Sequence, residues 1–369
     1  MIQFLGLSFL KRAGVWRAVA VPVDRATIPL NASSAAVGGV TSVSESLVEV
    51  RPGEWIRAGS LALRDAFLSI PAKVRRVWGF ALAGPPGWVA LNPALEPITS
   101  VRLTPDPRAD FSQWLATNPK EKPHIYSVLS PKDFFRHAVS GALAADVTQA
   151  EGFARLERGA TRWDQADILA AEFLPSWFPP VFDSGTATGR ISEDGIRHTG
   201  LPGGLWVAAG CQADRSALVS AGDLRTGTLL VRPDVSMHSE GAALEILSVC
   251  SHSNAPQNKA LSSRAPLVAH RCDRWQVVGE SPAETAEATA AALHRLAGET
   301  PCPLLDARPG DDLAALNALE VQLRPAPLRS PHFGKEDPGV AYLAGMAHGV
   351  FRGPDDLYRK LREAQSAEQ

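Results

Sequence analysis

One short stretch of the chain combines residue types that are common at catalytic turns. Residues 207–222 read VAAGCQADRSALVSAG, a run of small apolar residues typical of a buried strand, followed by a helical pattern. A catalytic acid often stands where such a strand meets a helix, but the polar residue at this turn is Gln212. An amide donates and accepts hydrogen bonds, yet it takes up no proton at neutral pH. The stretch therefore predicts a group that can bind a hydroxyl and cannot activate it.

The two neighbours of Gln212 offer other chemistry. Asp214 would serve as a base only if the turn were rebuilt around it, and a helix N-cap or first-turn acid is the alternative role. Cys211 would be a nucleophile if it stood at a helix N-terminus, where the helix dipole lowers the pKa of a thiol. The alternative is a small buried residue. Both hypotheses stay open at this point.

A second group of residues has the types that bind zinc. Cys250 and His252 are separated by one residue, as are His270 and Cys272. On two paired strands, residues i and i+2 share a face, so these four side chains would surround a Zn²⁺ ion. One intervening residue is fewer than the usual spacing in structural zinc sites. Buried thiols and surface imidazoles are therefore the alternative.

The composition excludes several classes of partner. The net charge is −2, whereas binding to a nucleic-acid backbone or an anionic membrane needs a basic surface. No run of about 18 apolar residues exists, and the N-terminal residues lack a signal-peptide pattern. Four cysteines in 369 residues do not form a disulfide framework. We expect a cytoplasmic protein without nucleic-acid or membrane partners.

The elements that must position these residues follow from hydrophobic periodicity. Three antiparallel strands are predicted at 2–10, 15–23 and 27–33. A helix is predicted over 54–70, followed by a mostly buried strand over 77–84.

The rest of the chain repeats this pattern loosely. Helices are predicted over 131–146, over 166–174 and over 281–298, the last with Ser281 as N-cap of a capping box. Residues 250–266 are predicted to be a polar loop or a mobile insertion. This alternation predicts an α/β protein with two lobes of similar design.

Four segments stand in a recognisable order: LSPKDFFRHAVSGALAADVTQAEG (129–152), RWDQADILAAEFLPSWFPPVFDSGTATGRI (162–191), TGLPGGLWVAAG (199–210) and GVAYLAGMAHGVF (339–351). In order and pattern they resemble the FGGY family of carbohydrate kinases, and its xylulokinase-like branch most. The resemblance implies two actin-like (ribonuclease H-like) lobes, with a sugar and ATP meeting between them. The dense match covers roughly residues 50–235 and returns near the C-terminus.

The resemblance also assigns positions to the parts that phosphoryl transfer requires. In the family's first hairpin, an Asp positions the metal and small residues admit the phosphates. This chain has Ser8 at the Asp, Leu10 at the glycine and Lys11 at the threonine. Either Lys11 contacts phosphate directly, or the hairpin ends in an ordinary solvated turn.

Two sugar-binding motifs are altered as well. Pro85 and Pro86 stand where the family has the glutamine and histidine that help to hold the sugar, and proline donates no hydrogen bond. The family's W-x-D-x-R motif becomes TPDPR, which keeps Asp106 and Arg108 and has Thr104 at the tryptophan. Asp106 and Arg108 are candidates to bind a polar ligand; the alternative is a surface loop.

The remaining catalytic motifs fail too. The family's general base is an Asp, and Gln212 occupies its place. The glycine-rich phosphate loop aligns with RPDVSM (232–237), where Asp234 would face phosphate with like charge. The family segment after Gly279 is missing, and LDARPG (305–310) stands near the adenine-side loop. Five independent losses predict the remains of a kinase site.

These observations predict an N-terminal FGGY-like lobe over 1–205 and a reduced C-terminal lobe over 206–369. The leading hypothesis is a pseudokinase without cofactor that acts as a binding or accessory subunit. It would bind a small polar metabolite, with Asp106, Arg108, Gln212 and Asp214 as ligand candidates, or associate with a protein partner or with itself. One alternative is an active ATP- and Mg²⁺-dependent sugar kinase that uses Asp214 or Asp234. The other is a different chemistry that depends on Cys211.

Overall fold

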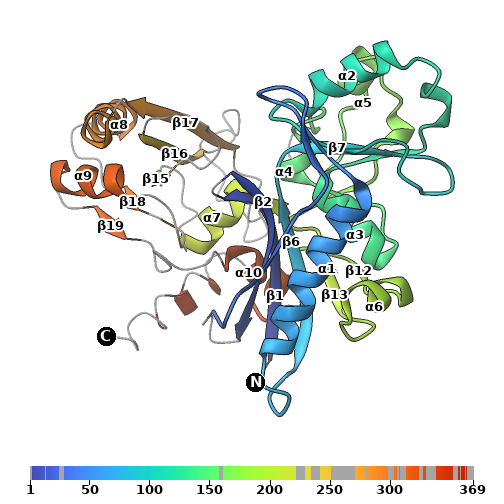
Figure 1. Ribbon diagram of the computed structural model, residues 1–369, viewed down its shortest axis with the longest axis horizontal. Helices are drawn as coiled ribbons and strands as arrows, with labels where there is room; N and C mark the ends of the chain where they lie inside the picture. Colours follow the sequence, from blue (N-terminus) through green and yellow to red (C-terminus); the bar gives the residue numbers. More distant parts are fainter. Residues whose placement is uncertain are drawn as a thin grey trace. The chain divides into compact units, whose positions relative to one another are not determined.

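The computed structural model divides the chain into two compact units (Figure 1). The first comprises Met1–Leu10, Val15–Ala213 and Val340–Phe351, and the second comprises Lys11–Gly14, Asp214–Gly339 and Arg352–Gln369. The structure describes residues 2–12, 14–24, 29–157, 161–221, 229–233, 242–250, 271–279, 281–297, 303–305, 307, 313–323, 327–329, 338–351, 356–357, 359–361 and 363.

The first unit is built on a mixed sheet with the strand order β12-β13-β6-β1-β2-β3, with β14 paired to β6. Strand β6 runs parallel to β1, to β13 and to β14. Parallel neighbours bring their carboxyl ends to one edge of the sheet, where ligands bind in open α/β folds. The strands are β1 (Gln3–Arg12), β2 (Val15–Asp24), β3 (Ser33–Ala36), β6 (Val77–Gly84), β12 (Ala187–Arg190), β13 (Trp206–Ala208) and β14 (Cys211–Gln212).

The predicted strands at 2–10, 15–23 and 77–84 are confirmed, but the third strand was placed wrongly. It is β3 at Ser33–Ala36, which pairs antiparallel with β2. Within the described part of the predicted segment, Pro29 forms a bridge to Val23 and the Leu30 N–H donates to the carbonyl of Pro22. Only its last residue, Ser33, lies in the regular ladder, opposite Ala20. A proline has no N–H to continue a ladder, so regular pairing begins further along the chain.

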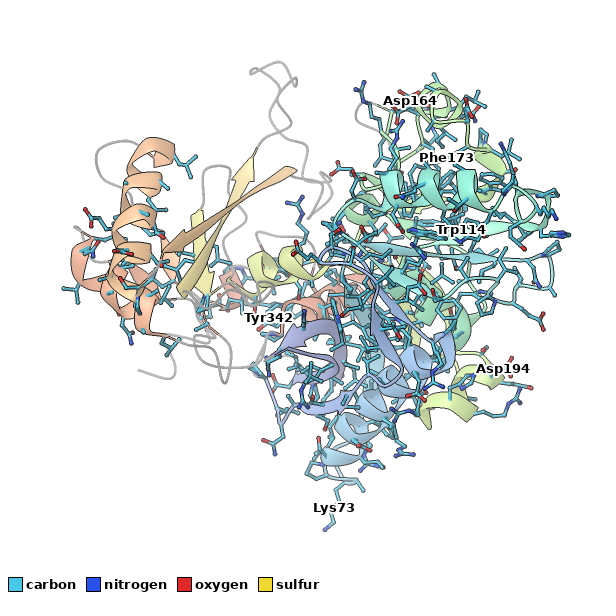
Figure 2. All side chains as sticks on the ribbon, turned by 45° about the horizontal axis from the view of Figure 1, so that its top comes forward. Lys73, Trp114, Asp164, Phe173, Asp194 and Tyr342 are labelled. Atoms are coloured by element: carbon cyan, nitrogen blue, oxygen red, sulfur yellow. The ribbon has the colours of Figure 1, made fainter. Side chains whose placement is uncertain are left out.

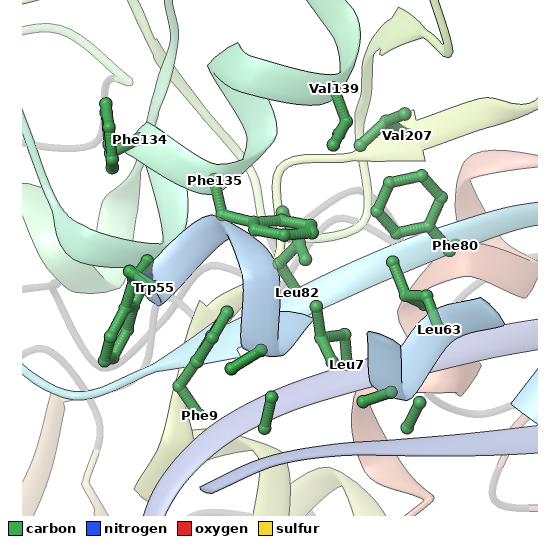
Figure 3. Close-up of a cluster of buried hydrophobic side chains, with 14 of the residues drawn as sticks. Leu7, Phe9, Trp55, Leu63, Phe80, Leu82, Phe134, Phe135, Val139 and Val207 are labelled. Carbon is green, nitrogen blue, oxygen red and sulfur yellow. The ribbon is translucent and has the colours of Figure 1, made fainter. Parts of the chain in front are cut away.

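The two faces of β1 are covered by elements from distant parts of the sequence. Leu7 and Phe9 belong to the core beneath helix α1 (Pro52–Ser69), as Figure 3 shows. On the other face, Phe4 contacts Phe351. Alternate residues of a strand point to opposite faces, so this strand is buried on both sides.

Gly6 shows how closely helix α10 (Gly339–Ala347) lies against the second face. A Cβ atom built on Gly6 would lie 2.5 Å from Cγ1 of Val340 and 2.7 Å from the backbone nitrogen of Ala341. Only glycine permits this approach. The helix is apolar throughout and its first residues are buried, because it packs against the sheet.

The helix predicted over 131–146 is shorter than expected. Helix α3 spans Pro131–Ser140 and ends at Gly141, whose φ of 72° is a left-handed cap. Asp146 then caps a separate short helix, α4 (Val147–Ala150), through the backbone N–H groups of Thr148 and Gln149. The cap residues split the predicted helix into two elements. The helix predicted over 166–174 is likewise shorter, since α5 is Gln165–Ala170.

A second sheet in this unit has the order β4-β5-β8-β7-β9 and packs against helix α2 (Pro107–Thr117). An aromatic cluster fills the space between them, with Phe111 in contact with Trp88, Trp114, Phe173 and Trp177. Figure 2 labels Trp114 and Phe173 of this cluster. The strands are β4 (Val40–Ser42), β5 (Val48–Val50), β7 (Gly87–Leu91), β8 (Val101–Leu103) and β9 (Ser127–Leu129).

The second unit contains a five-stranded sheet of order β17-β16-β15-β18-β19. Ser281 caps helix α8 (Pro282–Ala297) by accepting a hydrogen bond from the backbone N–H of Glu284, as predicted. The other elements are α7 (Ala213–Ala221), β15 (Leu229–Pro233), β16 (Ala242–Cys250), β17 (Arg271–Gly279), β18 (Leu304–Leu305), α9 (Ala314–Gln322) and β19 (Leu328–Arg329). Cys250 ends a strand, and residues 251–266 of the predicted polar loop lie outside the described residues.

Candidate functional site

The candidate site lies at the carboxyl ends of β6 and β14 in the first unit. Strand register puts Cys211 opposite Ala83 and Gln212 opposite Gly84. Gln212 is thus the last residue of β14, and helix α7 begins immediately after it at Ala213. The predicted turn from strand to helix is confirmed.

The backbone of Gln212 is held in place by a threonine that is distant in sequence. Its N–H donates to Oγ1 of Thr148 at 2.8 Å. The same hydroxyl lies 2.6 Å from a carboxylate oxygen of Asp146 and donates to it. The side-chain amide of Gln212 makes no hydrogen bond to any residue in the described part of the chain and is partly exposed. Its role as a ligand-binding group stays a prediction.

Gln149, also distant in sequence, fixes the loop that follows β6. It is almost completely buried, and its Nε2 lies 3.1 Å from the carbonyl oxygen of Gly84 and 3.3 Å from that of Pro85. The N–H of Thr104 donates to the carbonyl of Pro86 at 3.3 Å. The structure thereby brings together the two altered sugar-binding motifs, the segment with Pro85 and Pro86 and the TPDPR segment (104–108). We call Gly84, Pro85, Thr148, Gln149 and Gln212 together the Gln212 edge.

A buried cluster of four charged side chains supports this edge. Lys132 Nζ lies 3.0 Å from Asp146 and also contacts Asp133, and Arg136 lies 2.9 Å from Asp133. Lys132 and Arg136 both donate to the carbonyl of Ala209, at 2.9 and 2.8 Å. The two positive and two negative charges balance, which is the condition for burying ionised groups.

The charges of this cluster affect the pKa of Asp146, which accepts the hydrogen bond from Thr148. Burial raises the pKa of Asp146 above its ordinary value, while Lys132 opposes this by stabilising the carboxylate. The ionised form also accepts hydrogen bonds from the Thr148 and Gln149 backbone. Sequence reasoning missed Thr148 and Gln149, although the Asp146 cap that precedes them is a local signal of a helix start.

Asp106 and Arg108 have partners within the protein. Asp106 caps α2 by accepting a hydrogen bond from the Ala109 N–H at 2.9 Å. Arg108 forms an ion pair with Asp167 at 2.7 Å. Thr104, two residues before Asp106, bonds Pro86, which directly follows a residue of the Gln212 edge. Their role as ligand-binding groups stays a prediction.

Four further candidate residues are described by the structure to different extents. Cys211 is a fully buried thiol within β14, so a reagent does not reach it without local opening. Asp214 lies in α7, but its side chain is outside the described residues, as is all of Asp234. Ser8 is a buried residue within β1, opposite Ala83, and the strand continues through Leu10 and Lys11.

The zinc hypothesis also falls partly outside the described residues. Cys250 is opposite Arg271, and Cys272 is opposite Val249, in the ladder between β16 and β17. His252 and His270 are not among the described residues. No group of three potential metal ligands occurs among the residues that the structure describes, and zinc binding stays a prediction.

Sequence reasoning also missed Asp183, which precedes β12. Its carboxylate is half-buried, and burial raises the pKa of Asp183. One oxygen of the carboxylate and the hydroxyl of Ser184 are buried without a hydrogen-bond partner among the described residues. Nothing in the sequence signals this arrangement, since an isolated Asp-Ser-Gly is typical of a turn.

We expect Asp183→Asn to stabilise the protein at neutral pH and to lose that advantage in acid. The folded-state pKa of Asp183 exceeds its unfolded value, so the native state holds the proton more tightly. The contribution of Asp183 to stability is present below the unfolded pKa and is lost as pH rises through the folded pKa. Urea titrations from pH 3 to pH 8 measure this. An equal stability difference at every pH would contradict it.

Solved structures of other proteins share this fold. No protein-family model matches the sequence, and no curated protein matches it. Among solved structures, the chain is similar to a xyloylose kinase from Brucella ovis (TM-score 0.70, 16% identity, 99% of this chain and 97% of that chain). It is also similar to a xylulose kinase from Rhodospirillum rubrum (TM-score 0.69, 15% identity, 99% and 98%).

A gluconate kinase from Lactobacillus acidophilus is similar over the same extent (TM-score 0.64, 11% identity, 99% of this chain and 95% of that chain). No helix within the described residues is both long and apolar enough to cross a lipid bilayer. The predicted resemblance is confirmed at the level of the fold: this chain has the mixed α/β fold of the FGGY carbohydrate kinases.

Proposed function

We propose that this protein binds a small polar metabolite at the Gln212 edge and does not transfer a phosphoryl group from ATP. The observation that carries the proposal is the residue at the end of β14. The resemblance assigns the general base to this position, and the chain has an amide there. An amide hydrogen-bonds a hydroxyl without removing its proton.

The surroundings of Gln212 support a binding role. Thr148 fixes its backbone and Gln149 fixes the neighbouring loop, so the polar groups at the edge are held in place before any ligand arrives. Preorganised groups lose little conformational entropy on binding. Ser8, at the position assigned to the metal-binding carboxylate, is buried within β1 and carries no charge. The proposed function therefore needs neither ATP nor Mg²⁺.

The first experiment measures phosphoryl transfer directly. The purified protein is incubated with ATP, Mg²⁺ and either xylulose, gluconate or glycerol, and ADP formation is followed in a coupled assay. We expect no ADP above the protein-free rate. Gln212→Asp should be equally inactive, because one carboxylate does not replace the missing metal ligand.

Sugar-dependent ADP formation by the wild-type protein would contradict the proposal and favour the rebuilt kinase site. Asp214→Ala and Asp234→Ala would then identify the base. Calorimetry of the protein with the same compounds, without ATP, tests the binding role itself. A binding heat that disappears in Gln212→Ala supports it.

A second part of the proposal concerns assembly. The buried supporting cluster and the core of the first unit are intact around a site that lacks the assigned base. Retention of the scaffold without the base favours an accessory subunit that acts through its surface. Light scattering on protein co-expressed with its genomic neighbours measures this. A strictly monomeric particle that co-purifies with nothing would contradict the accessory role and leave ligand binding unaffected.

A further inference from the structure

The turn that contains Asp183 is tied to the strand that ends at Gln212. The carbonyl of Asp183 accepts a hydrogen bond from the Thr186 N–H at 2.9 Å, which closes a tight turn. The carbonyl of Ser184 accepts one from the Gly210 N–H at 2.9 Å. Gly210 precedes Gln212 by two residues, and two residues of extended chain span about 7 Å.

A second connection fixes the same turn from the other side. Phe182, immediately before Asp183, is opposite Asp146 in the ladder between β10 (Ala145–Asp146) and β11 (Val181–Phe182). Asp146 holds Thr148, which in turn holds the backbone of Gln212. Asp183 is therefore a neighbour of the Gln212 edge by two independent routes.

Buried polar atoms of this turn lack hydrogen-bond partners among the described residues. Neither carboxylate oxygen of Asp183 accepts a hydrogen bond from the described residues, and burial raises the pKa of this carboxyl. The hydroxyl of Ser184 is completely buried and also lacks a partner among those residues. Buried polar atoms without partners are rare in folded proteins, and each one calls for a group that satisfies it.

We propose that Asp183 binds a protonated amine on the ligand of the Gln212 edge. A carboxylate accepts hydrogen bonds only, and an ammonium group is a compact charge that donates three. The Gln212 amide supplies neutral groups for the hydroxyls of the same ligand. The ligand class is thus a small polyhydroxylated amine. This inference rests on the proposed binding function.

Two compounds that differ in one group test the assignment. Glucamine (1-amino-1-deoxysorbitol) carries a protonated amine at pH 7.5, and sorbitol has a hydroxyl in its place. Isothermal calorimetry on the full chain should give a dissociation constant for glucamine at least tenfold below that for sorbitol. Asp183→Asn should abolish this preference for glucamine. Asp194→Asn, which removes an exposed carboxylate of α6 (Glu193–Thr199), is the matched control and should keep the full difference.

The salt dependence of binding is a further measurement, and a folding defect would not produce the expected difference between the two compounds. Raising NaCl from 50 to 500 mM should weaken glucamine binding and leave sorbitol binding unchanged, because only the first depends on a charge pair. Equal affinities for the two compounds would overturn the amine assignment and leave the proposed binding function standing. Retention of the glucamine preference in Asp183→Asn would also overturn it. Absence of binding for both compounds would overturn this inference, and the calorimetry with sugars would decide the proposed function separately.

Discussion

Lys132→Met is expected to lower the free energy of unfolding by about 3–5 kcal/mol, the usual effect of removing one partner from a buried ion pair. Lys132 is completely buried and contacts both Asp133 and Asp146. Methionine keeps the length of the side chain, but it leaves two buried carboxylates facing a single cation, Arg136. Urea or thermal unfolding measures the loss.

Two further variants separate charge from packing. In the Lys132→Met background, Asp146→Asn removes the uncompensated charge, and we expect it to recover part of the lost stability. Arg197→Met, which breaks an exposed pair with Asp194, should cost less than about 1 kcal/mol. If Lys132→Met were no more harmful than Arg197→Met, the buried cluster would not have the supporting role described above.

Gly210→Ala is expected to be similarly severe, with a loss of more than about 3 kcal/mol in unfolding free energy. Gly210 has a φ of 78°, and a Cβ atom there would lie 1.9 Å from the carbonyl oxygen of Leu82. That oxygen belongs to the backbone of β6, a strand between two neighbours, which cannot move aside as a side chain can. The variant would also displace Gln212 relative to Gly84, so ligand binding should be lost with stability.

Gly204 provides the matched control for this substitution. Its φ of 77° is nearly the same, but no atom lies within 4 Å of the position of a Cβ atom. Gly204→Ala should therefore show only the backbone cost of a left-handed residue, about 1–2 kcal/mol. Equal effects of the two substitutions in thermal unfolding would mean that the close contact with Leu82 does not contribute to the loss of stability.

Elements whose signals are local could be predicted from the sequence. The strands at 2–10, 15–23 and 77–84 follow from hydrophobic patterning, and the start of α8 follows from Ser281 and the residues after it. The helix predicted over 131–146 is longer than the observed one, which shows that hydrophobic periodicity alone does not locate the end of a helix. Gly141 and Asp146 end one helix and begin another, and their capping roles outweigh an uninterrupted pattern of apolar residues.

The candidate site was predicted in part. The position of Gln212 at the end of a strand and at the start of a helix was anticipated, because both elements have local patterns. Thr148 and Gln149 were missed, since their contacts join residues about 65 positions apart in sequence. Asp183 was missed because its neighbour Ser184 is tied to Gly210, a residue distant in sequence. Burial of Lys132 was likewise unforeseen, because a lysine beside an aspartate is typical of an exposed helix start.

The approach of α10 to Gly6 has a consequence for how the protein is made in the cell. The first unit takes strand β1 from residues 3–12 and α10 from residues 339–347, so all the residues between them are synthesised before the two can pack together. Until α10 leaves the ribosome, Phe4 and its neighbours on that face of the sheet stay uncovered. Nascent chains with such apolar surface are substrates for chaperones. We therefore expect the first unit to reach its native packing only after α10 has been synthesised.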